Sequence, residues 1–265
     1  MPKPTFIELT DGTVIPILYE DRSVLAIDKP AGWLLAPDSW DRTGRNLQLA
    51  LRSSIQTGDF WARSRNLDYL RFAHRLDADT SGVLILIRNP SAMRAYTGLF
   101  EARRVEKSYL AVVRGVPDRE RWICRLKLAR HPTLRGRMKV DQRHGQEATS
   151  RFRVLRTSGR TALVAAQPLT GRTHQIRVHL AESGHPVIGD ALYGPATERR
   201  RNTPDASGFI LALRAVSLGY VDPFQRRDIR IEAPAGPFLK AFGFGGTLPG
   251  FRARSAIHES EPDCD

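Results

Sequence analysis

Residues 72–86 read FAHRLDADTSGVLIL and place a cluster of polar side chains directly before a block of branched apolar residues. The apolar block, Gly82 to Arg88, has the composition of a buried strand. Loops at strand ends are where a rigid scaffold presents reactive groups. Asp77 or Asp79 is therefore a candidate nucleophile, because the neighbouring Arg75 would favour an ionised carboxylate. An ordinary hydrogen-bonded turn built from Asp, Thr and Ser explains the same composition equally well.

Strand-like and helix-like segments alternate irregularly around this block. A helix is expected after Asn89 and Pro90, which suit its cap and first turn. Further strands are expected at residues 24–27, 107–115 and 161–166. Several strands are separated by too few residues for a helical crossover, and no repeat of fixed period is present. The pattern predicts an α+β fold with much antiparallel sheet.

A second polar cluster lies in residues 171–184, GRTHQIRVHLAESG. This segment predicts a helix that begins near Thr173 as its N-cap and ends at a glycine. His174 and Arg177 are three residues apart and would share one face, which could meet an anion. A basic helix face that is simply solvated remains the alternative.

The chain is strongly basic. Lys and Arg number 41 against 28 Asp and Glu, which gives a formal net charge of +13. This excess favours a polyanionic partner, with nucleic acid first, although some basic proteins bind none. Arginine supplies most of the excess, and its planar guanidinium suits phosphates and bases. Residues 118–143 read as a basic, largely exposed excursion with little periodicity.

The sequence lacks the motifs of several classes of cofactor-binding and membrane proteins. The only cysteines are Cys124 and Cys264, and the three histidines between residues 174 and 185 lack the spacing of known zinc motifs. No phosphate-binding glycine loop or dinucleotide fingerprint is present. No signal peptide is recognisable, and the longest apolar block is too short to span a bilayer. We therefore expect a cytoplasmic protein that uses no metal, no organic cofactor and no membrane.

Five blocks of the sequence resemble the RluA family of pseudouridine synthases and occur in the order of that family. They are KPAG at 29–32, HRLDADTSG at 74–82, KSYLAVVRG at 107–115, GRTHQIRVHL at 171–180 and GHPVIGDALYG at 184–194. The resemblance implies the pseudouridine synthase fold, a mixed and mainly antiparallel sheet in two halves with flanking helices and a central cleft. It also implies a catalytic domain over residues 19–243, after an N-terminal extension at 1–18 that reads as an extended arm. Residues 244–265 read as a disordered tail.

The resemblance also implies roles for individual residues. Asp77 would be the catalytic aspartate, attacking a uridine in RNA either at the base or at ribose C1′. Tyr109 would stack on the flipped base and assist removal of the C5 proton, and Arg177 would pair with the aspartate. Arg75 would enter the space that the flipped nucleotide leaves.

Weaker assignments complete the implied site. Contacts that hold the site or the RNA backbone would come from His74, Lys107, Arg172 and His174. The substrate would be ribosomal or transfer RNA, and we expect a monomer because one cleft can contain the reaction. A non-catalytic RNA-binding protein that retains the fold is the main alternative. A glycosidase that uses Asp77 with Asp79 is another.

Two departures from the family concern RNA contacts. After KPAG, residues 33–37 read WLLAP, where relatives often place a valine and a histidine before the proline. The arginines of residues 119–143 and of the run 199–201 are a hypothetical source of substrate selectivity, in place of an added RNA-binding module.

Overall fold

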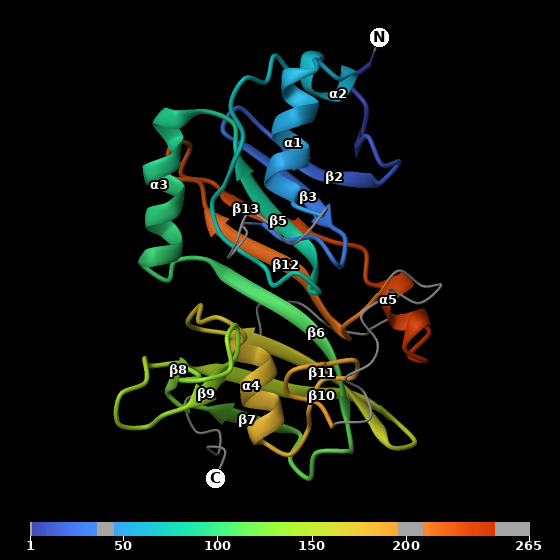
Figure 1. Cartoon of the computed structure of the whole chain (residues 1–265), viewed down its shortest axis with the longest axis vertical. Coiled ribbons are helices and arrows are strands. Elements are labelled where there is room, and N and C mark those ends of the chain that lie inside the picture. The colour runs from blue at the N-terminus through green and yellow to red at the C-terminus, as the bar shows by residue number, and fades with distance from the viewer. Residues whose placement is uncertain (1, 36–44, 196–208, 247–265) are drawn as a thin grey trace. The chain divides into compact units, whose positions relative to one another are not determined.

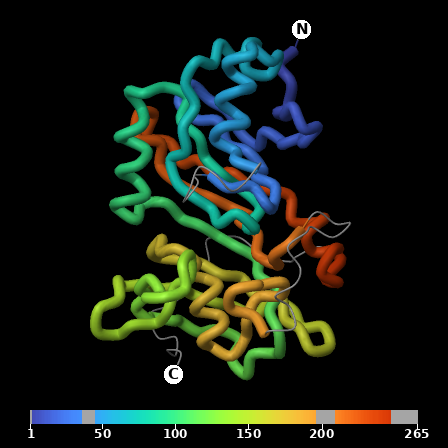
Figure 2. The backbone as a smooth tube through the Cα atoms, viewed as in Figure 1, coloured from blue at the N-terminus to red at the C-terminus, as the bar shows by residue number. Residues whose placement is uncertain are grey.

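The computed structural model describes residues 2–35, 45–195 and 209–246, which belong to two compact units (Figure 1). The first unit comprises residues 1–105 and 218–233, and the second comprises residues 106–217 and 234–265. The chain therefore leaves the first unit after residue 105, returns to it for residues 218–233 and then passes to the second unit again, as the trace in Figure 2 shows.

The first unit is built on an antiparallel sheet. Its strands are β1 (Phe6–Glu8), β2 (Val14–Glu20), β3 (Val24–Lys29), β4 (Arg71–Phe72), β5 (Ser81–Ile87) and β13 (Asp228–Glu232). The order is β1-β2-β3-β5, with β4 also paired to β5. β13 pairs with β12 (Leu213–Val221), whose residues are divided between the two units. The helices are α1 (Leu47–Gln56), α2 (Phe60–Arg63) and α3 (Pro90–Glu101).

The β5 strand forms the centre of this unit's core. All seven of its residues are buried, as the run of branched residues predicts. α3 lies against β5 (Figure 1) and contributes Tyr96 and Leu99 to the same apolar cluster. The predicted start of α3 is confirmed, because Asn89 Oδ1 accepts from the Ala92 amide at 2.8 Å and Pro90 occupies the first turn. The core thus fixes the strand that follows the Asp77 loop.

The first eighteen residues differ from the extended arm that the sequence suggests. β1 and β2 form a hairpin in which Ile7 pairs with Ile15, and both side chains are fully buried. Exposed and buried residues alternate in Phe6–Glu8 and at the start of Val14–Glu20, so one face packs while the other stays exposed. The hairpin therefore belongs to the sheet of the first unit.

The second unit also contains a mainly antiparallel sheet. Its strands are β6 (Glu106–Arg114), β7 (Arg121–Cys124), β10 (Ser150–Ser158) and β11 (Thr161–Pro168), in the order β12-β6-β11-β10-β7. A separate two-stranded sheet joins β8 (Leu128–Arg130) and β9 (Met138–Val140). The helices are α4 (Gln175–Glu182) and α5 (Gly236–Ala241). α4 contacts β9, β10 and β11, and its Ile176 and Leu180 pack into the core. The predicted strands and the predicted α+β class are confirmed.

Two segments of the second unit are more ordered than the sequence suggests. Residues 118–143, predicted as an exposed excursion, include β7, β8 and β9, and Trp122 to Cys124 are buried. Because arginines flank this short apolar run, the charge of the segment predicted that it would be exposed. Phe244, predicted to open a disordered tail, packs into the core, and residues 247–265 lie outside the described part of the chain.

Candidate functional site

The Asp77 loop connects β4 to β5 in the first unit. The side chain of Asp77 is partly buried, and its carbonyl oxygen accepts from the Thr80 amide at 3.2 Å. The amide of Gly32 donates to the carbonyl of Ala78 at 2.9 Å, which ties this loop to the KPAG turn. Two of the five family blocks therefore form one local structure.

Lys29 is the buried cation that holds this loop. It is fully buried, and its ammonium donates to the carbonyls of Pro30 at 3.0 Å, Ala78 at 2.7 Å and Thr80 at 2.9 Å. Burial lowers the pKa of Lys29 to about 7, although the charges of Asp79 and Asp77 oppose this shift. Lys29 was not predicted as a residue of the site, since its only signal in the sequence was its place at the end of an apolar strand.

The two residues before Leu76 have different surroundings. The His74 ring stacks on Phe100 with centroids 4.6 Å apart, and its Nε2 accepts from the Ile85 amide at 3.0 Å. These contacts anchor His74 to α3 and β5, so it supports the loop from within the first unit. Arg75 is exposed, as a residue that contacts RNA must be. The predicted RNA contacts of both residues stay predictions.

Tyr109 and Lys107 lie on β6 in the second unit. They are two residues apart and therefore point to the same face of the strand. Tyr109 is half-buried opposite Ala166 of β11. The ammonium of Lys107 donates to the Thr170 carbonyl at 3.2 Å, and burial lowers its pKa to about 8. Lys107 thus connects β6 to the turn that precedes α4.

The buried side-chain amide of Gln175 holds the turn that precedes α4. The Oε1 of Gln175 accepts from the Thr170 hydroxyl at 2.7 Å and from the Arg172 amide at 3.0 Å. Its Nε2 donates to the Thr149 carbonyl at 2.9 Å. The Nε of Arg172 donates to the Glu147 carbonyl at 3.0 Å. Because a buried amide is costly unless it is hydrogen-bonded, this network favours one conformation of residues 170–175.

The predicted N-cap of α4 is wrong. The helix begins at Gln175, and its N-cap is His174 in the left-handed conformation, with φ at 55° and no side-chain capping bond. Such a conformation costs about 1–2 kcal/mol for a residue with a Cβ, so its surroundings must hold it. The predicted glycine at the other end is confirmed, since Gly184 adopts φ of 80° and donates to the Ala181 carbonyl. Every residue from Gln175 to Leu180 is buried, which excludes a solvated basic face for this turn of α4.

Arg177 forms a buried ion pair with Asp190, which was not among the predicted site residues. Its Nε lies 2.7 Å from Asp190 Oδ2 and its second guanidinium nitrogen donates to Oδ1 at 2.8 Å. Burial alone would raise the pKa of Asp190, but the guanidinium and the amides of Tyr193 and Leu192 reverse this effect, and the pKa is lowered. Asp190 lies in the GHPVIGDALYG block, where nothing in the sequence pointed to Arg177. The predicted pairing of Arg177 with Asp77 stays a prediction.

The predicted site residues are divided between the two units. Asp77, His74 and Arg75 belong to the first unit, and Tyr109, Lys107, Arg172, His174 and Arg177 belong to the second. The departures at residues 33–37 fall partly outside the described chain, although Trp33 and Leu35 are buried. The arginine run 199–201 also lies outside the described residues.

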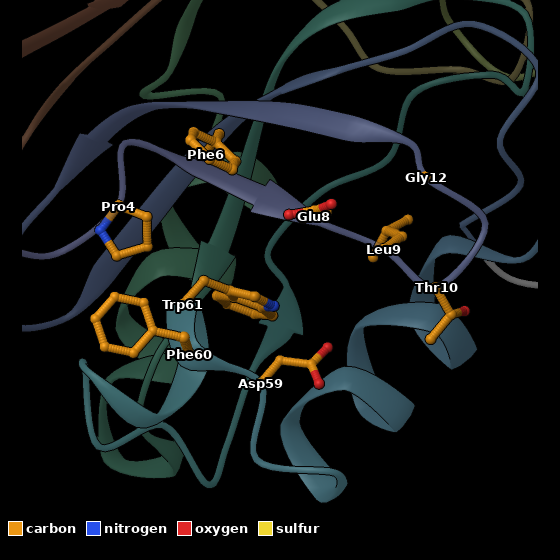
Figure 3. Close-up of a pocket in the computed structure, with 9 residues that line it drawn as sticks. All are labelled: Pro4, Phe6, Glu8, Leu9, Thr10, Gly12, Asp59, Phe60 and Trp61. Carbon is orange, nitrogen blue, oxygen red and sulfur yellow. The ribbon is translucent and has the colours of Figure 1, made fainter.

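The first unit contains a pocket of about 550 Å³ that none of the predicted site residues line (Figure 3). Its walls are β1, the segment after it and the start of α2, with the aromatic residues Phe6, Phe60 and Trp61. Its only charged lining groups are the carboxylates of Glu8 and Asp59, which do not suit an anionic ligand. In the described ranges no cluster of three or more His, Cys, Asp or Glu could hold a metal, and no helix is long and apolar enough to cross a membrane.

Comparisons with known proteins agree on one family. The family model described as RNA pseudouridylate synthase matches residues 23–182. The ribosomal large subunit pseudouridine synthase C of Escherichia coli strain K12 is 33% identical over 231 residues, which are 84% of this chain and 67% of that protein. The protein of the same name from Vibrio cholerae is 33% identical over 229 residues.

Solved structures give the same answer for the fold. The structure of human RNA pseudouridylate synthase domain containing 1 matches with a TM-score of 0.65 and 28% identity, covering 83% of each chain. Human RNA pseudouridylate synthase domain containing 4 matches with the same TM-score of 0.65 at 23% identity, which supports the fold alone. The sequence blocks, the family model and these relatives together show that the chain belongs to the RluA branch of the RNA pseudouridylate synthase family and is an isomerase that acts on uridine in RNA.

Proposed function

We propose that this enzyme converts uridine to pseudouridine in ribosomal RNA and that Asp77 is its nucleophile. The observation that carries the proposal is the clamped Asp77 loop, in which Lys29 binds the backbone on both sides of Asp79. A nucleophile is effective when its backbone is held before the substrate arrives. Ribosomal RNA is the substrate named for the bacterial relatives that are 33% identical.

The reaction rearranges bonds without a change of oxidation state. Asp77 attacks either the uracil ring or ribose C1′, and the bond between N1 and C1′ breaks. The uracil turns, C5 bonds to C1′, C5 loses its proton and N1 gains one. The aspartate is released at the end, so the atoms balance with no redox partner.

Residues of the second unit complete the proposed site. Tyr109 stacks on the flipped uracil and helps to remove the C5 proton. Arg177 would pair with the Asp77 carboxylate, as the resemblance to the family implies. The buried Asp190 holds the guanidinium that does this. Lys107 and Arg172 hold the turn before α4.

The RNA must expose its target. A uridine in a stacked helix is inaccessible, so it has to leave its stack, and exposed Arg75 would fill the space it leaves. The net charge of +13 supplies attraction to the phosphate backbone. We infer that one chain suffices for catalysis and that it acts in the cytoplasm.

Two matched variants test the proposal. Purified wild type, Asp77→Asn and Asp79→Asn are incubated separately with large-subunit ribosomal RNA, small-subunit ribosomal RNA and transfer RNA, and pseudouridine is mapped in each. We expect a product in large-subunit RNA with wild type and Asp79→Asn, and none with Asp77→Asn. A product only in transfer RNA would refute the substrate, and an active Asp77→Asn would refute the nucleophile. If Asp79→Asn were as inactive as Asp77→Asn, a two-carboxylate mechanism would regain support.

A further inference from the structure

Tyr193 has no role in the proposed chemistry, yet it is the meeting point of several groups in the second unit. Its hydroxyl oxygen accepts from the Met138 amide of β9 at 2.8 Å. The same oxygen lies 2.8 Å from Nδ1 of His174, the left-handed N-cap of α4. One phenol therefore connects the β8–β9 hairpin to the start of α4.

The ring of Tyr193 makes a second set of contacts. The guanidinium carbon of Arg177 lies 5.2 Å from the ring centroid, and that of Arg137 lies 5.5 Å from it. Both distances fall within the range of about 6 Å at which a cation is attracted to an aromatic face. The ring also meets the His174 ring edge to face, with centroids 5.6 Å apart.

The backbone of Tyr193 is held by the carboxylate that pairs with Arg177. The Tyr193 amide donates to Asp190 Oδ1 at 3.0 Å, and the same oxygen accepts from Arg177. Arg177, Asp190 and Tyr193 thus form a closed set of contacts, in which moving one residue changes the other two. Buried networks of this kind favour one arrangement of all their members.

The hairpin at the other end of these contacts is basic and lightly packed. It carries Arg130, Arg135, Arg137 and Lys139, and Arg143 follows it closely in the chain. The apolar cluster beneath it contains Leu128, Ala148 and Val178, against which Met138, Val140 and Tyr193 pack. Because this cluster is small, the hydroxyl and ring contacts of Tyr193 add to the backbone hydrogen bonds between Leu128 and Gln146 in fixing the hairpin.

We propose that Tyr193 is a positioning residue that couples the basic β8–β9 hairpin to Arg177 and His174. When RNA phosphates engage the hairpin, Arg137 and the Met138 backbone hold the phenol, and the phenol holds the two site residues in the arrangement that catalysis uses. The inference rests on the proposed function, because it assigns Arg177 and His174 to the site. It adds a residue that makes the rate of isomerisation depend on correct docking of the RNA.

The first test removes only the hydroxyl. Tyr193→Phe keeps the ring but leaves the Met138 amide and His174 without this partner. We expect the single-turnover rate constant to fall about tenfold while the RNA concentration for half-maximal rate stays within about twofold. The matched control is Tyr220→Phe, which removes a buried hydroxyl of the first unit that has no hydrogen-bond partner, and we expect it to leave both constants unchanged. A lower reaction amplitude with an unchanged rate constant would mean a purely structural role and would overturn the proposal.

The second test asks whether the hairpin acts through Tyr193. Arg137→Met removes the cation over the ring and should lower the rate constant about threefold in the wild-type background. In a Tyr193→Leu background the same change should lower RNA affinity but produce no further fall in the rate constant. Effects of the two substitutions on the rate constant that simply multiply would refute the coupling.

A third readout separates this inference from the proposed function. Hydrogen exchange at the Met138 amide does not depend on activity or on the identity of the RNA. Tyr193→Phe should speed this exchange about tenfold, because the amide loses its acceptor. Faster exchange in an enzyme that is inactive on ribosomal RNA would reject the substrate proposal and leave the contact intact. Unchanged exchange would reject the contact itself.

Discussion

Asp190 is fully buried and pairs with the guanidinium of Arg177 through two hydrogen bonds. Removing one partner of a buried ion pair leaves an uncompensated charge. We expect Asp190→Asn to lower the free energy of unfolding by about 3–5 kcal/mol at pH 7, measured by urea denaturation. Asp118→Asn, which removes an exposed carboxylate, serves as the control and should change little.

The pH dependence of this pair has a definite sign. The pKa of Asp190 is lowered in the folded protein. Its contribution to the free energy of unfolding is therefore fully present above the pKa of the unfolded chain, about 3.9, and is lost as the pH falls through the lower pKa of the folded protein. The difference in stability between wild type and Asp190→Asn should therefore shrink below about pH 4. A difference that stayed constant down to the lowest pH at which the protein folds would contradict the ion pair.

The buried His179 should affect stability in a different pH range. Both of its ring nitrogens lie near oxygen partners, Ser150 Oγ at 3.1 Å and the Leu126 carbonyl at 3.0 Å. Burial lowers its pKa from 6.5 to about 4. Between these values the unfolded chain binds a proton that the folded protein does not, so stability falls as the pH drops from 6.5 to 4, by about 3 kcal/mol in total. His179→Asn should remove this part of the pH dependence in urea titrations, and an unchanged slope would show that the imidazole titrates normally.

Single residues were the hardest feature to predict from the sequence. Asp77 stood out because it lies in a polar cluster before a buried strand. Lys29, Asp190 and Tyr193 gave no such signal, since each derives its importance from partners that meet it only in the folded chain. Thr173 was predicted as a cap from its residue type, whereas the Gln175 amide shapes the turn and leaves His174 at the cap position.

At the scale of elements, the β8–β9 hairpin is a defined element that carries several basic side chains. If it binds RNA phosphates, each lost phosphate contact should lower affinity and reduce the slope of log K against log salt by about 1. We expect a variant with Arg130, Arg135 and Arg143 changed to Gln to bind RNA more weakly and with a smaller salt slope, measured by filter binding.

A charge-matched control makes this prediction specific. The exposed residues Arg52, Arg63 and Arg94 of the first unit are changed to Gln instead, which removes the same net charge. Equal losses in the two variants would mean that the attraction comes from overall charge. Unchanged binding in the hairpin variant would reject the hairpin as an RNA contact.

The elements themselves differed in how well the sequence predicted them. β5 and α3 were predicted because a long run of branched residues and a capped helical repeat are strong local signals. The strands between residues 118 and 143 were missed because each is only three or four residues long and is flanked by arginines. Strands of this length depend on their pairing partners, which composition does not reveal.

At the scale of the whole molecule, the class, the family and a sheet in two halves were predicted, while the residues at which the chain passes between the two units were not. Five ordered blocks indicated the family, and the family model over residues 23–182 confirms it. The second unit takes residues from two separate stretches of the chain, as does the first. Such a division depends on long-range pairing, and no composition boundary marks it in the sequence.

The most direct test is pseudouridine mapping of total RNA from cells that lack this protein. The cells are complemented with wild type, Asp77→Asn or Asp79→Asn at matched expression. We expect one or more pseudouridines of large-subunit ribosomal RNA to disappear in the deletion, to return with wild type and with Asp79→Asn, and to stay absent with Asp77→Asn. Restoration by Asp77→Asn, or a lost site in another class of RNA alone, would contradict the proposed function.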